Sequence, residues 1–106
     1  MPQRFEVRTG ENGELALSGE LDVAAAERFT RAVAEAHGAG GLILDLSEVT
    51  FIDSTGLRSL LAAAKDLQGR GELVLARPSQ RVLEVLEIAG VLGRAPNLVV
   101  RTEGTA

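Results

Sequence analysis

The sequence contains no cysteine, tryptophan or tyrosine, and only one histidine. Without cysteine there can be no disulfides, thiolate metal sites or cysteine nucleophiles. One imidazole is too little for a zinc or non-haem iron site. Three phenylalanines are the only aromatic residues, so the core is expected to be aliphatic. These shortages make catalysis hard, and we expect no metal, no cofactor and no enzyme activity. Function should rest on a few polar residues or on a surface.

Charge and hydropathy exclude further classes of protein. The net charge is −4 and no run of basic residues occurs, which argues against nucleic acid as a partner. No apolar stretch approaches the ~20 residues of a membrane span, and residues 1–6 do not resemble a secretory signal. The 106 residues suit one domain. We expect a single cytoplasmic domain over residues 1–106, with an ordered core at about 4–101 and a frayed tail at 102–106.

Apolar segments predict five strands. Residues 5–9 and 15–19 should form an antiparallel hairpin around the turn signal Asn12-Gly13. Three further strands are predicted, the first of them covered on both faces because its residues are mostly apolar without alternation; they are residues 42–46, 72–76 and 97–100. Residues 47–52 are interpreted as a short connection.

Three helices are predicted between the later strands. Asp22 should cap the first, over about 23–36, with Phe29, Ala32, Val33 and Ala36 on its buried face. The second begins at 53–56 and buries Leu57, Leu60, Leu61, Ala64 and Leu67; the third follows Ser79 and buries Val82, Val85, Leu86 and Ala89. Strands separated by helices should be parallel. The fold class is therefore α/β, a mixed and mostly parallel sheet with an N-terminal hairpin and about three helices.

Common catalytic and phosphate-binding motifs are absent or incomplete. The glycines at 38–41 precede a strand, whereas a dinucleotide fingerprint follows one, so a helix stop is the better interpretation. Ser54 has only half of a G-x-S-x-G elbow, and His37, interpreted as a surface residue, is the only base. Asp45 ends a predicted strand, as a phospho-accepting aspartate would, but the only lysine, Lys65, falls within a helix.

One polar group remains, the run Asp53-Ser54-Thr55-Gly56 at a predicted helix start. A plain helix cap explains it, since Asp, Ser and Thr are all common N-cap residues. A plain cap does not explain two features of this run. Three side chains with capping chemistry stand together where one suffices, and a glycine in the first turn costs about 1 kcal/mol relative to alanine unless something approaches its backbone closely. The residues alone leave the two interpretations open.

Residues 45–57, DLSEVTFIDSTGL, strongly resemble the central signature of STAS domains, particularly bacterial anti-sigma factor antagonists. Residues 17–22, LSGELD, resemble a second landmark of that family, and the order of elements fits over nearly the whole chain. The resemblance implies a STAS-like domain. It also implies that Ser54 accepts phosphate from an anti-sigma factor that is an ATP-dependent, GHKL-type serine kinase, with Thr55 as a possible second site.

In that family the unphosphorylated protein binds the anti-sigma factor and frees the sigma factor. The phosphoprotein releases it, and a PP2C-type phosphatase restores the first form. The resemblance also allows another class of function, a scaffold or accessory subunit in stressosome-like or lipid-transport complexes. Relatives commonly carry a helix after the last strand. We expect that helix to be absent or very short here, because only residues 101–106 follow the last predicted strand. We expect a monomer or a weak dimer.

Charge is divided unevenly along the chain. Residues 1–53 carry a net charge of −6 and residues 54–106 a net charge of +2. Because aspartates open two helices after strands, they should lie at the same end of the sheet as Ser54. We predict a docking rim there, formed by Glu20, Asp22, Asp53, Ser54, Thr55, Gly56, Leu57 and Arg58. The other interpretation, that Asp22 and Asp53 are only caps, stays open.

Overall fold

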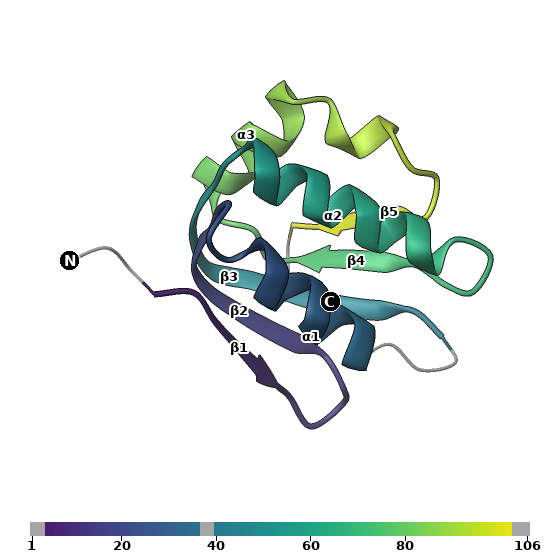
Figure 1. The fold of residues 1–106 in the computed structure, drawn as a ribbon. Coiled ribbons are helices and arrows are strands. Elements are labelled where there is room, and N and C mark those ends of the chain that lie inside the picture. Colours follow the sequence, from purple (N-terminus) through teal and green to yellow (C-terminus); the bar gives the residue numbers. More distant parts are fainter. Residues whose placement is uncertain (1–3, 37–39, 103–106) are drawn as a thin grey trace.

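The computed structural model describes residues 4–36 and 40–102. It is a five-stranded sheet with three α-helices (Figure 1). The elements in chain order are β1 (Glu6–Thr9), β2 (Leu15–Leu21), α1 (Ala26–Ala36), β3 (Leu42–Ile52), α2 (Ser54–Leu67), β4 (Leu73–Ala76), α3 (Gln80–Ile88), the short 3-10 helix η1 (Val91–Gly93) and β5 (Leu98–Arg101). The expected α/β class is confirmed.

The strands lie side by side in the order in which they occur in the chain, β1-β2-β3-β4-β5. β1 pairs antiparallel with β2, as the hairpin predicted, and every later pairing is parallel. When successive crossovers advance in one direction with the same hand, their helices fall on the same face of the sheet. Accordingly α1 and α2 lie side by side on one face (Figure 1), and side chains of all three helices enter one core cluster.

Within the described residues no helix packs on the other face of the sheet, which corrects the prediction that residues 42–46 are covered on both sides. Along this segment buried and less buried residues alternate: Leu42, Leu44 and Leu46 are buried, whereas Ile43 is exposed and Asp45 half-buried. The apolar composition indicated burial but could not reveal the strand order that leaves this face open. β4 was predicted correctly, because all four of its residues are buried.

β3 also runs six residues further than predicted, through the segment interpreted as a connection. Its second half pairs in parallel with β2, and the register shifts twice because β3 advances one residue more than β2, opposite Ala16–Ser18 and opposite Gly19–Glu20. Such irregularities break the two-residue alternation by which a strand is recognised in a sequence. β4 pairs only with the first four residues of β3, so the later part of β3 extends beyond β4.

Two helix predictions need correction. α1 begins at Ala26, three residues later than predicted, because Asp22 closes a separate turn: both its carbonyl and its Oδ1 accept the Ala25 N–H, at 3.0 and 3.1 Å. In α3, Ala89 is exposed and stands at the C-cap rather than on the buried face. Gly90, with φ of 70°, turns the chain so that Val91 is buried instead.

The predicted starts of α2 and α3 are confirmed, whereas Val85 of α3 is half-buried and lies outside the core cluster. Ser79 caps α3 by accepting the Val82 N–H at 3.2 Å, and α2 ends at Leu67 ahead of Gly69, which has φ of 84°. Three predictions cannot be assessed, because His37, residues 38–39 and residues 103–106 lie outside the described residues. Within the described residues, no helix is long and apolar enough to cross a membrane.

Candidate functional site

Ser54 stands where β3 passes into α2, and it is the first residue of that helix. Asp53 supplies the cap: its Oδ1 accepts the Gly56 N–H at 2.9 Å, and its carbonyl accepts the Leu57 N–H at 2.9 Å. In the described part of the chain no hydrogen bond reaches the Ser54 hydroxyl, and Ser54 is exposed. One residue of the polar run therefore caps the helix, and the neighbouring hydroxyl is left free at its positive end.

Gly56 has a structural explanation. The first turn of α2 lies directly against the end of β2, and a Cβ at Gly56 would come closer than 3.0 Å to the Leu21 carbonyl oxygen. The Asp53 N–H donates to the same carbonyl at 3.3 Å. The close approach that the sequence indicated is thus made by this chain's own backbone. Gly56 itself is buried.

The ends of β2 and β3 bring the predicted acidic residues together. Leu21 pairs with Ile52 and Glu20 with Phe51, so Asp22 and Asp53 leave the sheet side by side. Both aspartates accept a backbone N–H, Asp22 from Ala25 and Asp53 from Gly56. The capping interpretation is therefore correct for Asp53, whereas the Asp22 carboxylate closes the turn that precedes α1. Their contact with a partner stays a prediction.

The other predicted residues fall on different sides of α2. Arg58 is exposed one turn beyond Ser54, on the same face of the helix. Thr55 is half-buried and its carbonyl accepts the Ser59 hydroxyl at 3.0 Å. Leu57 is also half-buried and packs against the core. Ser54 and Arg58 are therefore the most accessible members of the group, whereas Gly56 and Leu57 support the helix from within.

Two exposed apolar residues near the ends of β2 and β3 were not predicted as site residues. Val23, in the turn after Asp22, is 70% exposed, and Phe51, two residues before Asp53, is 46% exposed. Large apolar side chains at the surface are the usual anchors of protein interfaces. The sequence could not single them out, because Val23 was assigned to a helix and Phe51 to a connection. The pairing of Phe51 with Glu20 shows its position only once the sheet register is known.

The rim is less acidic than its sequence suggested. A hollow of about 330 Å³ beside Glu20 and Asp22 is also lined by Arg4 and Arg28. The Arg28 guanidinium lies over the ring of Phe5, 5.9 Å from its centroid, which fixes its side chain at this place. The two arginines offset the two carboxylates, so the surface offers paired charges of both signs.

One other charged pair lies further back along β3. The Arg77 guanidinium donates to Asp45 Oδ2, and the Ser47 N–H donates to Asp45 Oδ1 at 3.0 Å. Burial pushes the pKa of Asp45 upward, but the hydrogen bonds from Ser47 and the charge of Arg77 outweigh it and hold the pKa below the ordinary value of 3.8. Asp45 is thus occupied in an ion pair.

Comparison with known proteins identifies the family of this chain. Residues 6–106 match the STAS domain family. The chain belongs to that family. BtrV of Bordetella bronchiseptica, whose name places it among anti-sigma factor antagonists, is 40% identical over 76% of this chain and 72% of its own length. The anti-sigma-B factor antagonist of Listeria monocytogenes is 36% identical over 74% of this chain and 71% of its own.

Solved structures show the same STAS fold. The Thermotoga maritima protein TM1081 superposes with a TM-score of 0.73 at 22% identity, covering 94% of this chain and 87% of its own. SpoIIAA in its unphosphorylated form has a TM-score of 0.65 at 23% identity, over 94% and 90% of the two chains. SpoIIAA has also been solved in its phosphorylated form, at a TM-score of 0.58 and 21% identity, over 94% and 93% of the two chains.

Proposed function

We propose that this STAS protein is an anti-sigma factor antagonist, switched by phosphorylation of Ser54. The unphosphorylated protein binds an anti-sigma factor serine kinase and releases the sigma factor; the kinase phosphorylates Ser54 and the complex dissociates; a PP2C-type phosphatase reverses the modification. The names of the Bordetella and Listeria relatives support the proposal. The observation that carries it is the exposed Ser54 hydroxyl, which α2 does not use for its own cap.

The fold should tolerate a phosphate at Ser54. The group would sit at the N-terminus of a 14-residue helix, where the positive end of the helix dipole favours an anion. Arg58 is exposed one turn away and, within the described residues, has no ion-pair partner, so its guanidinium is available to the phosphate. Phosphorylation should therefore change the surface and leave the domain folded.

The same phosphate should weaken binding strongly. It adds a charge of about −1.5 to −2 at neutral pH. A unit charge opposed by a like charge ~6 Å away across an interface costs about 0.7 kcal/mol in water and ~3 kcal/mol at an effective dielectric constant near 20. Affinity for the partner is then expected to fall by roughly ten- to several-hundred-fold.

The docking surface should combine three kinds of group. Ser54 and Arg58 lie at its centre, Glu20 and Asp22 supply charge along the end of β2, and Val23 and Phe51 supply apolar area. Apolar anchors provide most of the affinity of an interface, whereas charges at its edge set partner choice and association rate.

Incubation with the cognate kinase and ATP tests the proposal. Intact-mass analysis should show one phosphate on the wild-type protein and none on Ser54→Ala, whereas Thr55→Ala should report any second site. Ser59→Ala is the matched control, because the Ser59 hydroxyl is half-buried and bonds the Thr55 carbonyl, and it should be phosphorylated like the wild type. Stoichiometric phosphorylation of Ser54→Ala would show that the site is wrong.

A scaffold role without a switch predicts a different result. The protein would then stay unmodified by kinases of its own cell. Its native complexes would contain a transport ATPase or stressosome-like partners in place of a GHKL-type kinase. Affinity capture from the native cell with wild-type and Ser54→Asp baits separates the two, since only the switch predicts a kinase that is captured by the first and lost from the second.

A further inference from the structure

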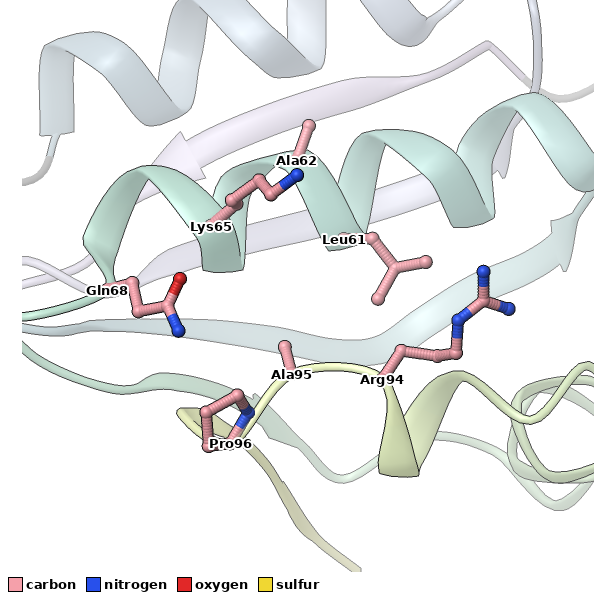
Figure 2. Close-up of a pocket in the computed structure, with 7 residues that line it drawn as sticks. All are labelled: Leu61, Ala62, Lys65, Gln68, Arg94, Ala95 and Pro96. Carbon is pink, nitrogen blue, oxygen red and sulfur yellow. The ribbon is translucent and has the colours of Figure 1, made fainter.

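A groove of about 350 Å³ lies at the opposite end of α2 from Ser54 (Figure 2). One wall is the C-terminal half of α2, and the other is the segment between η1 and β5. The lining residues are Leu61, Ala62, Lys65, Gln68, Arg94, Ala95 and Pro96. The lining residues on α2 begin at Leu61, seven residues or about 10 Å beyond Ser54 along the helix, and extend to Gln68. The groove is therefore separate from the proposed docking surface.

The two walls of this α2 groove are tied together by Asn97. Its side-chain N–H groups donate to the Ala64 carbonyl of α2 at 2.7 Å and to the Gly71 carbonyl at 3.1 Å. A hydrogen bond within the second wall stabilises it as well: the Leu98 N–H donates to the Ala95 carbonyl at 3.2 Å. These bonds hold the groove open without a ligand, and a preformed site avoids the cost of ordering it on binding.

The charged side chains that line the α2 groove are all positive. Two cations line it and no carboxylate does: Lys65 comes from α2, and Arg94 extends toward α2 from the facing wall (Figure 2). In the described part of the chain, neither Lys65 nor Arg94 takes part in an ion pair. Between them lies an apolar floor, in which Leu61 and Ala95 pack against the core. The Gln68 amide adds a neutral donor and acceptor at one end.

We propose that the α2 groove binds a small amphipathic anion, a free carboxylate or phosphate monoester with a short apolar body. The two cations on either side give the groove a positive potential that favours the charged head, and the floor of Leu61, Ala95 and Pro96 fits the body. A volume of about 350 Å³ falls at the small end of known ligand sites, which span roughly 300–1,000 Å³. This site is independent of phosphorylation at Ser54.

Titration of the isotope-labelled protein with octanoate and with octyl phosphate tests the inference by NMR. Saturable shifts should appear at the amides of residues 61–68 and 94–95. Octan-1-ol lacks the charge and inorganic phosphate lacks the apolar body. Each should bind at least about tenfold more weakly than octanoate. Lys65→Glu and Arg94→Glu should each weaken octanoate binding by about tenfold or more.

Arg70→Glu is the matched control. Arg70 is an exposed cation just beyond α2 whose guanidinium donates to the Asp66 carbonyl, and it does not line the groove. It should change octanoate affinity by less than about twofold. The inference is wrong if no saturable shifts occur at these amides, if octanol binds as well as octanoate, or if Arg70→Glu matches the loss in Lys65→Glu. The inference is also wrong if the protein binds phosphatidylglycerol vesicles but not monomeric octanoate. That result would assign Lys65 and Arg94 to a membrane surface.

Discussion

Replacing Gly56 with alanine should destabilise the protein, although the same change in most helices is stabilising. In a free helix interior, alanine is favoured over glycine by about 1 kcal/mol. Here the added Cβ would lie closer than 3.0 Å to the Leu21 carbonyl oxygen and 3.1 Å from Ile52 Cγ2. The carbonyl belongs to β2 and cannot rotate away as a side chain would. The start of α2 must therefore move outward.

The cost can be worked out from these contacts. Forcing a methyl group into a closely packed site costs typically ~1–3 kcal/mol. Outward movement of α2 also weakens the hydrogen bond from the Asp53 N–H to the Leu21 carbonyl, worth about 1 kcal/mol. After the helix-propensity gain is subtracted, Gly56→Ala should lower the free energy of unfolding by about 1–3 kcal/mol, with a loss of roughly 4–8 °C in Tm per kcal/mol.

Urea denaturation of wild type and variant measures this difference directly. Gly93→Ala is the control, because nothing lies within 4 Å of the Cβ it would add and its φ is not positive. Its stability should stay within about 0.5 kcal/mol of the wild type. A Gly56→Ala protein that is equal to or more stable than the wild type would refute the close approach of α2 to β2 and, with it, the position assigned to Ser54.

Three further predictions concern the cap, the ion pair and the apolar surface. Asp53→Ala removes the acceptor for the Gly56 N–H and should lower the free energy of unfolding by about 1 kcal/mol in urea titrations. Asp53→Asn keeps an acceptor oxygen and should lower it by less. Asp45→Asn should cost roughly 0.2–1 kcal/mol at neutral pH, since Arg77 is half exposed. Because the folded state lowers the pKa of Asp45, this stabilisation is present above the unfolded pKa of about 3.9 and is lost as pH falls below it. The two proteins should therefore converge in acid unfolding curves. Val23→Ser should weaken binding to the anti-sigma factor by about tenfold in calorimetry, whereas Ile88→Ser, at an even more exposed apolar residue on α3, should not.

The sequence predicted the features that depend on neighbouring residues. The start of α2 follows from Asp53, and that of α3 from Ser79, because each cap bonds an N–H three residues further on. The hairpin follows from its turn, where Gly13 has φ of 85°. Local chemistry decides each of these.

Features that depend on distant parts of the chain were missed. The second half of β3 is a strand only because β2 pairs with it through an interrupted register. The exposure of Ile43 follows from the strand order and the placement of the described helices on one face, which no local pattern records. At the site, the sequence located Ser54 but could not tell whether its hydroxyl caps the helix. The exposure of Val23 and Phe51 depends on the same long-range pairing.

The affinity of the anti-sigma factor kinase for the two forms of this protein tests the central proposal most directly. Isothermal titration should be run with unphosphorylated protein and with protein phosphorylated stoichiometrically at Ser54, with circular dichroism to verify that both are folded. We predict that the unphosphorylated form binds and that phosphorylation raises Kd by roughly ten- to several-hundred-fold with the fold intact. Equal affinities, or a loss of binding that accompanies unfolding, would contradict the switch.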